Sequence, residues 1–207
     1  MIKHISMKHG WYYFYRVHQA KSESLLNGDF QELHDYLGKM FDECPHDYFT
    51  CGPRSSHLTF DVKKEHQEVK FHETSQLALD ALQNMERYKT AHSKVEVFML
   101  EKDDKTIAVE VPIWLMPHEL DQFSELFDSE DPLTGHIDIL RIEEGKIWIW
   151  DFKPKADKEK HAHVQTLFYA IMLSKRTGIG LENFMCGYFD ENTSYVFKPE
   201  LDMVKFI

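Results

Sequence analysis

Two aspartates flank a predicted β-hairpin whose geometry brings their carboxylates together. Segment 135–153 alternates apolar and polar residues and reverses at 144–145, which predicts two antiparallel strands joined by a two-residue turn. A hairpin centred there pairs residues whose numbers add to 289, so Asp138 lies opposite Asp151. At about 5 Å the two charges repel by roughly 3 kcal/mol at an effective dielectric near 20. Because a shared proton or a cation must offset this repulsion, the pair predicts a divalent metal site.

Lys153 stands two residues after Asp151 on the same predicted strand. Side chains alternate along a strand, so the lysine shares the face of Asp151, whereas Trp148, Trp150 and Phe152 point to the opposite, packed face. A lysine beside a metal can orient an attacking water or stabilise an anionic transition state. The ordinary alternative, two strand-end aspartates satisfied by Lys153 or by water, stays open.

The composition predicts one globular domain. The chain has 207 residues, 43% of them apolar and 14% aromatic, enough to bury a sizeable core. We expect a single domain over 1–207, with an N-terminal helical and aromatic portion over about 1–60 and the core over about 61–207. No apolar run of about 18 residues could span a bilayer, and the first residues lack a signal-peptide core. We therefore expect a cytoplasmic protein with no membrane partner, and an origin in a virus stays open.

The charge is spread unevenly. The formal net charge is −11, yet segment 153–176 holds six basic residues against two acids. Nucleic-acid binding depends on lysine and arginine, and this basic segment begins at the predicted metal site. The overall negative charge therefore does not exclude a nucleic-acid partner.

Periodicity and turn residues predict an order of helices followed by strands. We expect helices over about 22–41, 61–88 and 158–177, and hairpins over about 94–115, 135–153 and 184–198. Segment 118–132 predicts a short amphipathic helix with a solvated acidic face, rather than a gate that repels phosphate. For the aromatic run 11–15 we expect core packing, with stacking on single-stranded bases as the alternative.

Three short motifs in this order resemble those of the PD-(D/E)XK nuclease superfamily, in its RecB-like branch. They are GHID (135–138), DFK (151–153) and QTLFY (165–169), which match the patterns GxxD, DxK and QxxxY. The upstream VKFHETSQLAL also resembles the helix that carries a histidine ligand in that branch, with His72 at the matching position. The resemblance covers about 70–198. It implies an α/β fold, a restriction-endonuclease-like α/β/α sandwich with a central mixed sheet.

The resemblance also implies a metal-dependent nuclease. Asp138, Asp151, His72 and the backbone carbonyl of Phe152 would bind Mg²⁺ or Mn²⁺, and Lys153 would act with them in hydrolysis of a phosphodiester bond. The expected substrate is DNA, as single strands or ends, in replication, recombination or repair.

Other residues of the expected site are less firmly fixed by the motifs. Gln165 and Tyr169 lie four residues apart on one helical face, and they would position the substrate rather than react with it. His57 or His66 could replace His72 as the histidine ligand. Glu73 and Glu110 are further candidate carboxylates.

The chain departs from the family pattern in ways that bear on its cofactors and partners. Iron–sulfur members carry four cysteines, whereas this chain has Cys44, Cys51 and Cys186, so we expect no iron–sulfur cluster. The chain has no GxxxxGK[ST] loop, so unwinding of DNA would need a helicase or recombination partner, and an oligomer is also open. The alternatives to a nuclease are a nucleic-acid-binding or structural subunit of a recombination or viral replication complex, and a hydrolase of small phosphoesters.

Overall fold

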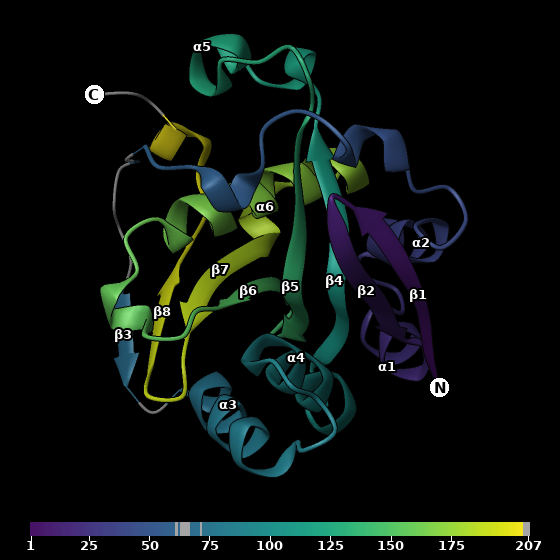
Figure 1. Cartoon of the computed structure of the whole chain (residues 1–207). Helices are drawn as coiled ribbons and strands as arrows, with labels where there is room; N and C mark the ends of the chain where they lie inside the picture. The colour runs from purple at the N-terminus through teal and green to yellow at the C-terminus, as the bar shows by residue number, and fades with distance from the viewer. Residues whose placement is uncertain (61, 63–66, 71, 205–207) are drawn as a thin grey trace.

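The computed structural model describes residues 1–60, 62, 67–70 and 72–204, and its centre is one eight-stranded sheet (Figure 1). The strands lie in the order β1-β2-β4-β5-β6-β7-β8-β3, and only the β6–β7 pairing is parallel among those described. The strands are β1 (Ile2–His9), β2 (Trp11–His18), β3 (Gln67–Lys70), β4 (Thr106–Leu115), β5 (Leu133–Glu143), β6 (Lys146–Phe152), β7 (Phe184–Phe189) and β8 (Thr193–Phe197).

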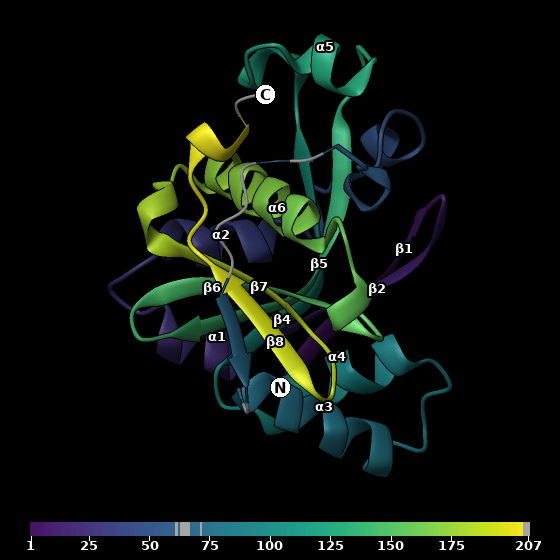
Figure 2. The same ribbon diagram turned by 90° about the vertical axis from the view of Figure 1, so that its left-hand side faces the viewer.

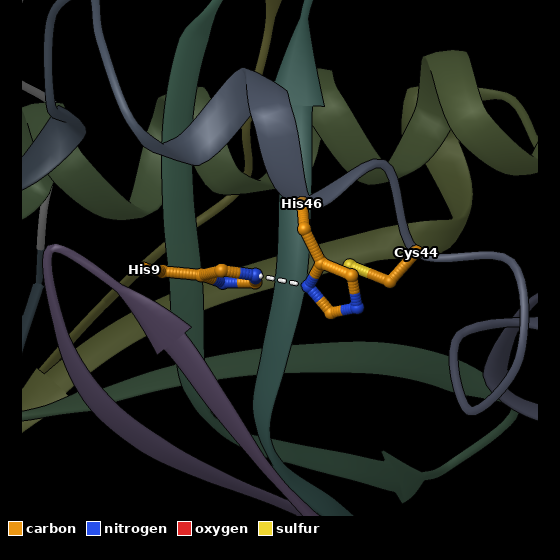
Figure 3. Close-up of side chains that lie close together, drawn as sticks. All are labelled: His9, Cys44 and His46. Atoms are coloured by element: carbon orange, nitrogen blue, oxygen red, sulfur yellow. Dashed lines mark hydrogen bonds between the residues drawn. The ribbon is translucent and has the colours of Figure 1, made fainter.

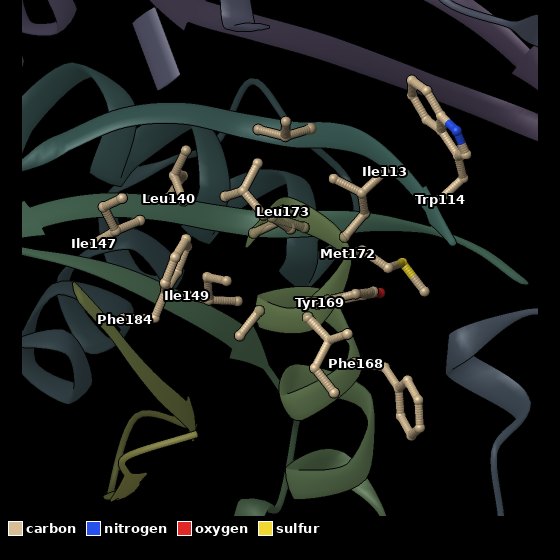
Figure 4. Close-up of a cluster of buried hydrophobic side chains, with 14 of the residues drawn as sticks. Ile113, Trp114, Leu140, Ile147, Ile149, Phe168, Tyr169, Met172, Leu173 and Phe184 are labelled. Carbon is tan, nitrogen blue, oxygen red and sulfur yellow. The ribbon is translucent and has the colours of Figure 1, made fainter. Parts of the chain in front are cut away.

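Helices cover both faces of the sheet and confirm the predicted α/β/α class. The apolar residues of α1 (Gln19–Leu25), α2 (Gln31–Lys39) and α6 (Ala162–Thr177) share one buried cluster with the sheet, part of which is drawn in Figure 4. Those of α3 (Glu73–Asn84) and α4 (Ala91–Lys102) form a second cluster on the other face, as the two views of Figures 1 and 2 show. In the described part of the chain, no helix is long and apolar enough to cross a membrane.

The β5–β6 hairpin has the predicted register. All five residue pairs recorded between the strands, from Ile139 with Trp150 to Glu143 with Lys146, obey the predicted pairing. The turn residues Glu144 and Gly145 have φ of 51° and 68°, and two successive positive values are typical of the type I′ turn that suits the twist of a two-residue hairpin.

The predicted helices are partly displaced. The segment expected as one helix over 22–41 forms α1 and α2, and the chain breaks between them at Gly28 and Phe30, whose φ angles are 87° and 60°. Of the helix expected over 61–88, α3 forms only the middle, because the chain pairs as β3 before it; residues 61, 63–66 and 71 lie outside the described part. The third helix, α6, begins at Ala162 rather than at about residue 158.

The hairpin predicted over 94–115 is wrong in its first half, which is helix α4. The apolar and polar alternation from Val95 to Met99 mimics a strand, but the helix has a side-chain N-cap, since Thr90 Oγ1 accepts a hydrogen bond from the Ser93 backbone N–H. The buried Val95 and Met99 lie four residues apart, on one helical face that packs against the sheet. Tertiary packing and capping therefore decide the structure here.

A buried arginine joins the end of α4 to β5. Arg141 has no exposed surface, and its Nε and Nη2 lie 2.8 and 3.2 Å from the two carboxylate oxygens of Asp103, the residue that follows α4. Its Nη2 also lies 2.8 Å from Glu73 at the start of α3. This bidentate contact fixes α4 against the strand that carries Asp138.

The chain begins with a hairpin, β1–β2, that the sequence analysis did not predict. Its aromatic run is not all core: Trp11, Tyr12 and Phe14 are 75%, 57% and 43% exposed, whereas Tyr15 is fully buried. Alternation along β2 explains why Tyr12 and Phe14 are exposed and Tyr15 is not; Trp11 shares the face of Tyr15 but stands at the start of the strand, next to the turn at Gly10. The expectation of core packing is thus wrong for the three exposed residues. The acidic segment 118–132 contains the helix α5 (Phe123–Phe127), as expected.

Candidate active site

Three carboxylates lie across three adjacent strands. The β5–β6 register leaves Asp138 opposite Asp151, and the β4–β5 pairs on either side of Glu110 leave this residue opposite Asp138. Glu110 has φ of 51°, which is uncommon for a residue with a side chain. Its carboxylate accepts a hydrogen bond from the backbone N–H of Phe14 in the N-terminal hairpin.

Asp138 bridges the two strands at the point where their recorded pairing stops. Its Oδ2 accepts a hydrogen bond from the backbone N–H of Phe152 at 3.1 Å. This contact holds Asp138 next to the segment that carries Asp151 and Lys153. The side chain of Phe152 is buried on the opposite face of β6, against α3 and α4.

Asp151 is buried, and Lys153 is its one positively charged partner among the described residues. It has no exposed surface, and Lys153 Nζ lies 2.8 Å from its Oδ2. Apart from this ion pair, neither carboxylate oxygen has a hydrogen-bond partner among the described residues. Buried carboxylates are normally paired, hydrogen-bonded or bound to a metal. A carboxylate that has, in the described structure, no donor at Oδ1 and one lysine at Oδ2 therefore fits the ligand shell of a cation.

The pKa shifts at the site also favour a bound cation. Burial raises the pKa of Asp151 from 3.8 to about 7; Lys153 opposes this rise and the charge of Asp138 adds to it. Burial likewise raises the pKa of Asp138, although Lys153 lowers it in part. Burial would lower the pKa of Lys153, but the charges of both aspartates outweigh it and keep the pKa above the ordinary value. The negative charge of the two aspartates thus exceeds the positive charge of one lysine.

Helix α4 adds a fourth carboxylate, Glu96, that the sequence analysis missed. It is 3% exposed, and its pKa is raised well above the usual value by burial first, and then by the charges of Glu110 and Asp138. A glutamate between two valines in an apolar segment indicates a functional acid, but the alternation of this segment predicts a strand. Carboxylate oxygens are the ligands that Mg²⁺ and Mn²⁺ prefer, so Asp138, Asp151, Glu96 and Glu110 are the candidate ligands for such an ion.

The histidine near this site is His92, one helical turn before Glu96. Burial lowers its pKa, while the charge of Asp151 and a hydrogen bond to the backbone of Phe152 oppose this. Its ring packs edge-on against Phe152 at 5.2 Å between centroids.

The structure does not bring His72 to the carboxylates. Its Nδ1 accepts a hydrogen bond from the Thr74 backbone N–H at 3.2 Å at the start of α3, and its ring lies 4.9 Å from that of Trp150. The charges that shift the pKa of His72 are those of Arg141, Glu143, Glu73 and Lys105. None of these residues belongs to the carboxylate cluster, so His72 lies away from a shared metal.

The other candidates from the sequence lie elsewhere. His57 is exposed, in the short 3₁₀ helix Ser55–His57, and His66 lies outside the described residues. Glu73 pairs with Lys105 and Arg141. Of the two further carboxylates considered, only Glu110 joins the cluster.

Gln165 and Tyr169 are placed beside the carboxylates by α6. The amide Nε2 of Gln165 donates to the Tyr169 hydroxyl at 2.6 Å. Burial, followed by the charges of Asp151 and Asp138, raises the pKa of Tyr169. A Cβ atom at Gly135 would lie 2.5 Å from the Tyr169 ring. The glycine of the GHID segment therefore lets the tyrosine lie against β5.

We expect the metal-free protein to lose stability relative to an Asp151→Asn variant as the pH rises. The pKa of Asp151 in the folded protein, about 7, exceeds its usual 3.8. Its stabilising contribution is therefore complete below pH 3.8 and is lost as the pH rises through about 7. At 1.4 kcal/mol per pKa unit, the expected change in the free energy of unfolding is on the order of 4 kcal/mol. Urea unfolding in EDTA across this pH range measures it, and a wild-type-to-variant difference that does not vary with pH would contradict it.

One comparison with known proteins found a match. A family model described as the PD-(D/E)XK nuclease superfamily matches residues 12–201, nearly the whole chain. The searches of curated proteins and of solved structures returned no match. The matched range includes all four carboxylates of the cluster together with Lys153, Gln165 and Tyr169. Nucleases of this superfamily use divalent metal ions, and the buried carboxylate of Asp151 is suited to bind such an ion. The chain belongs to the PD-(D/E)XK nuclease superfamily.

Proposed function

We propose that this protein is a deoxyribonuclease that uses Mg²⁺ or Mn²⁺ to hydrolyse phosphodiester bonds of single-stranded DNA or DNA ends. One observation carries the proposal: within the described part of the chain, the buried Asp151 has a single ion pair, from Oδ2 to Lys153, and no donor at Oδ1, although further carboxylates lie beside it. A bound divalent ion would supply positive charge that stabilises the negative charge developing on the scissile phosphate.

Lys153 supplies a positive charge of its own. The neighbouring carboxylates keep its pKa above the ordinary value, so it stays protonated at neutral pH and cannot act as a general base. Its ammonium group, held 2.8 Å from Asp151, is suited to donate hydrogen bonds to an attacking water or to a phosphate oxygen. We assign it the stabilisation of the transition state.

Tyr169 and Gln165 are suited to positioning. The raised pKa of Tyr169 keeps its hydroxyl protonated. The hydroxyl accepts a hydrogen bond from Gln165, so its own O–H remains available to donate to a phosphate oxygen. We assign both residues to holding the DNA backbone against the carboxylates.

The charge distribution around the site supports a nucleic-acid substrate. The first 18 residues, which form the β1–β2 hairpin, contain Lys3, Lys8 and Arg16 and no acid, in a chain with a net charge of −11. Segment 153–160, directly after β6, contributes four more lysines. Positive groups are therefore concentrated on two segments adjoining the carboxylates, where phosphates of a strand can be bound.

Exposed aromatic rings on the same hairpin support a single-stranded substrate. Tyr12, Phe14 and Arg16 follow one another along one face of β2. The backbone N–H of Phe14 donates a hydrogen bond to Glu110. The guanidinium of Arg16 lies 5.3 Å from the centre of the Phe14 ring. Aromatic rings interleaved with cations bind unpaired bases by stacking. Unwinding of duplex would come from a helicase partner in replication, recombination or repair.

The proposal is tested by incubating the purified protein with labelled single-stranded DNA, duplex DNA and RNA of one sequence, in Mg²⁺, Mn²⁺ or EDTA. We expect cleavage only with a divalent ion, and faster cleavage of single-stranded DNA or frayed ends than of blunt duplex. Cleavage in EDTA, or none of any nucleic acid with either metal, would contradict the proposal. Preferential cleavage of RNA would overturn the DNA assignment alone.

The exposed rings should contribute to substrate binding. We expect Tyr12→Ala with Phe14→Ala to raise the KM for single-stranded DNA by at least roughly 30-fold, because each lost stack costs about 1–3 kcal/mol and two are lost, with little change in kcat. Leu201→Ala, which removes an equally exposed apolar side chain from another part of the protein, serves as the control. An unchanged KM in the double variant would contradict stacking on the hairpin.

A further inference from the structure

A second group of metal-binding side chains lies at the end of the N-terminal hairpin, outside the carboxylate cluster. It consists of His9, the last residue of β1, and of Cys44 and His46 in the loop after α2 (Figure 3). The three residues each place one donor atom within 4.8 Å of the others. His9 Nε2 and His46 Nδ1 lie 2.8 Å apart.

The ring of His9 is fixed in the orientation that a metal ligand needs. Its other nitrogen, Nδ1, lies 2.8 Å from Nε2 of His136. Phe49 stacks on the ring, with centroids 4.0 Å apart and planes 13° apart. When Nδ1 carries the proton and donates to His136, the lone pair of Nε2 faces His46 and Cys44. Histidine ligands of metals are typically oriented by such a second hydrogen bond.

The donor set selects the kind of ion. Two imidazoles and one thiol suit zinc, whereas Mg²⁺ and Mn²⁺ prefer oxygen ligands. Arg54 lies close by, and donates hydrogen bonds to the backbone carbonyls of His9 and Phe49. A thiolate at Cys44 would offset part of the repulsion between its charge and a dication.

We propose that His9 Nε2, Cys44 Sγ and His46 Nδ1 bind one zinc ion, which clamps the N-terminal hairpin to the loop after α2. On binding, the Cys44 thiol releases its proton to solvent, and His46 stays neutral by carrying its proton on the exposed Nε2 instead of Nδ1. Among the described residues the group offers three donors, so water completes the tetrahedron. The site is independent of the carboxylates and of the proposed nuclease function.

The experiment measures metal binding directly. Protein stripped of metal is titrated with Zn²⁺ by calorimetry and, in parallel, reconstituted with Co²⁺, whose absorption reports a thiolate ligand and tetrahedral geometry. We expect one zinc ion per chain, a thiolate-to-cobalt band and a melting temperature that rises with zinc. The same result is expected in an Asp151→Asn background, which separates this site from the carboxylate cluster.

Matched variants identify the ligands. His46→Gln changes an exposed residue, and we expect at least a tenfold weaker zinc affinity; Cys44→Ala should also abolish the cobalt band. The controls are His118→Gln and Cys51→Ala, which change exposed residues outside the group and should bind zinc as the wild type does. Folding of each variant is checked by circular dichroism. Equal zinc affinity in wild type and in His46→Gln, absence of the cobalt band in the wild type, or binding of copper but not zinc would overturn the proposal.

Discussion

Replacing Asp151 by asparagine should reduce metal-dependent cleavage at least roughly 1,000-fold. The substitution keeps the shape of the side chain but replaces one carboxylate oxygen with an amide N–H₂ group and removes the charge. The remaining amide oxygen is a weaker ligand for a hard cation. The measurement is the single-turnover rate on labelled single-stranded DNA across a series of Mn²⁺ concentrations.

The same variant separates a catalytic loss from unfolding. Because the native carboxylate is buried at a cost, the metal-free Asp151→Asn protein should be at least as stable as the wild type at pH 8. Asp121→Asn, which changes an exposed acid outside the cluster, should leave the rate unchanged. Cleavage by Asp151→Asn at the wild-type rate would show that the activity belongs to other residues or to a contaminant.

Replacing Lys153 by methionine should lower the cleavage rate by about 100- to 10,000-fold without weakening the binding of Mn²⁺. Methionine keeps most of the length and apolar volume of the lysine stem but has no ammonium group. The lysine charge competes with a cation for Asp151, at 2.8 Å. Its removal should therefore leave Mn²⁺ affinity equal to or higher than that of the wild type.

Calorimetric titration of Mn²⁺ and single-turnover rates distinguish these two effects. A variant that binds Mn²⁺ tightly and cleaves slowly places Lys153 in the transition state. A variant that loses Mn²⁺ binding would instead indicate a structural role, and an unchanged rate would remove Lys153 from catalysis. Lys102→Met, at the exposed end of α4, is the matched control.

The core of the site could be predicted because its geometry is local. The alternation of segment 135–153 and the Glu144-Gly145 turn together determine one register, and the recorded β5–β6 pairs follow it. That register alone brings Asp138 opposite Asp151 and puts Lys153 on the same face. No contact distant in sequence is needed for this arrangement.

Glu96 could not be found in the same way. Val95 and Val97 flank it in a pattern that reads as a strand, and the helix is decided by contacts that the local pattern does not contain. These are the packing of α4 against β4 and β5 and the ion pairs of Arg141 with Asp103 beyond its end. Once the segment was assigned to a strand, no helical position remained for a fourth carboxylate.

The prediction of His72 as a metal ligand has a related weakness. The resemblance supplied a histidine near a helix, but the chain has thirteen and the motif does not determine which face of β6 the helix start meets. The structure puts His72 against Trp150 and puts His92 nearer to Asp151. Contacts between elements distant in sequence, rather than local patterns, decide such placements.

The N-terminal hairpin shows the limit of reading a run of aromatic residues by composition. Five successive aromatics predict burial, yet β2, which lies between β1 and β4, buries only one of its faces. Tyr15 packs beneath the hairpin, whereas Tyr12 points to solvent. The pairing of β2 with β4, which sets this orientation, joins residues about 90 positions apart.

The central claim is that the carboxylates of Asp138 and Asp151 bind one catalytic divalent ion. Its most direct test is an anomalous-difference map from crystals of this protein soaked in Mn²⁺. The account predicts a manganese peak between these two residues, about 2.0–2.3 Å from a carboxylate oxygen of each. Manganese bound elsewhere in the protein, with the Asp151 oxygens still without a ligand, would contradict it.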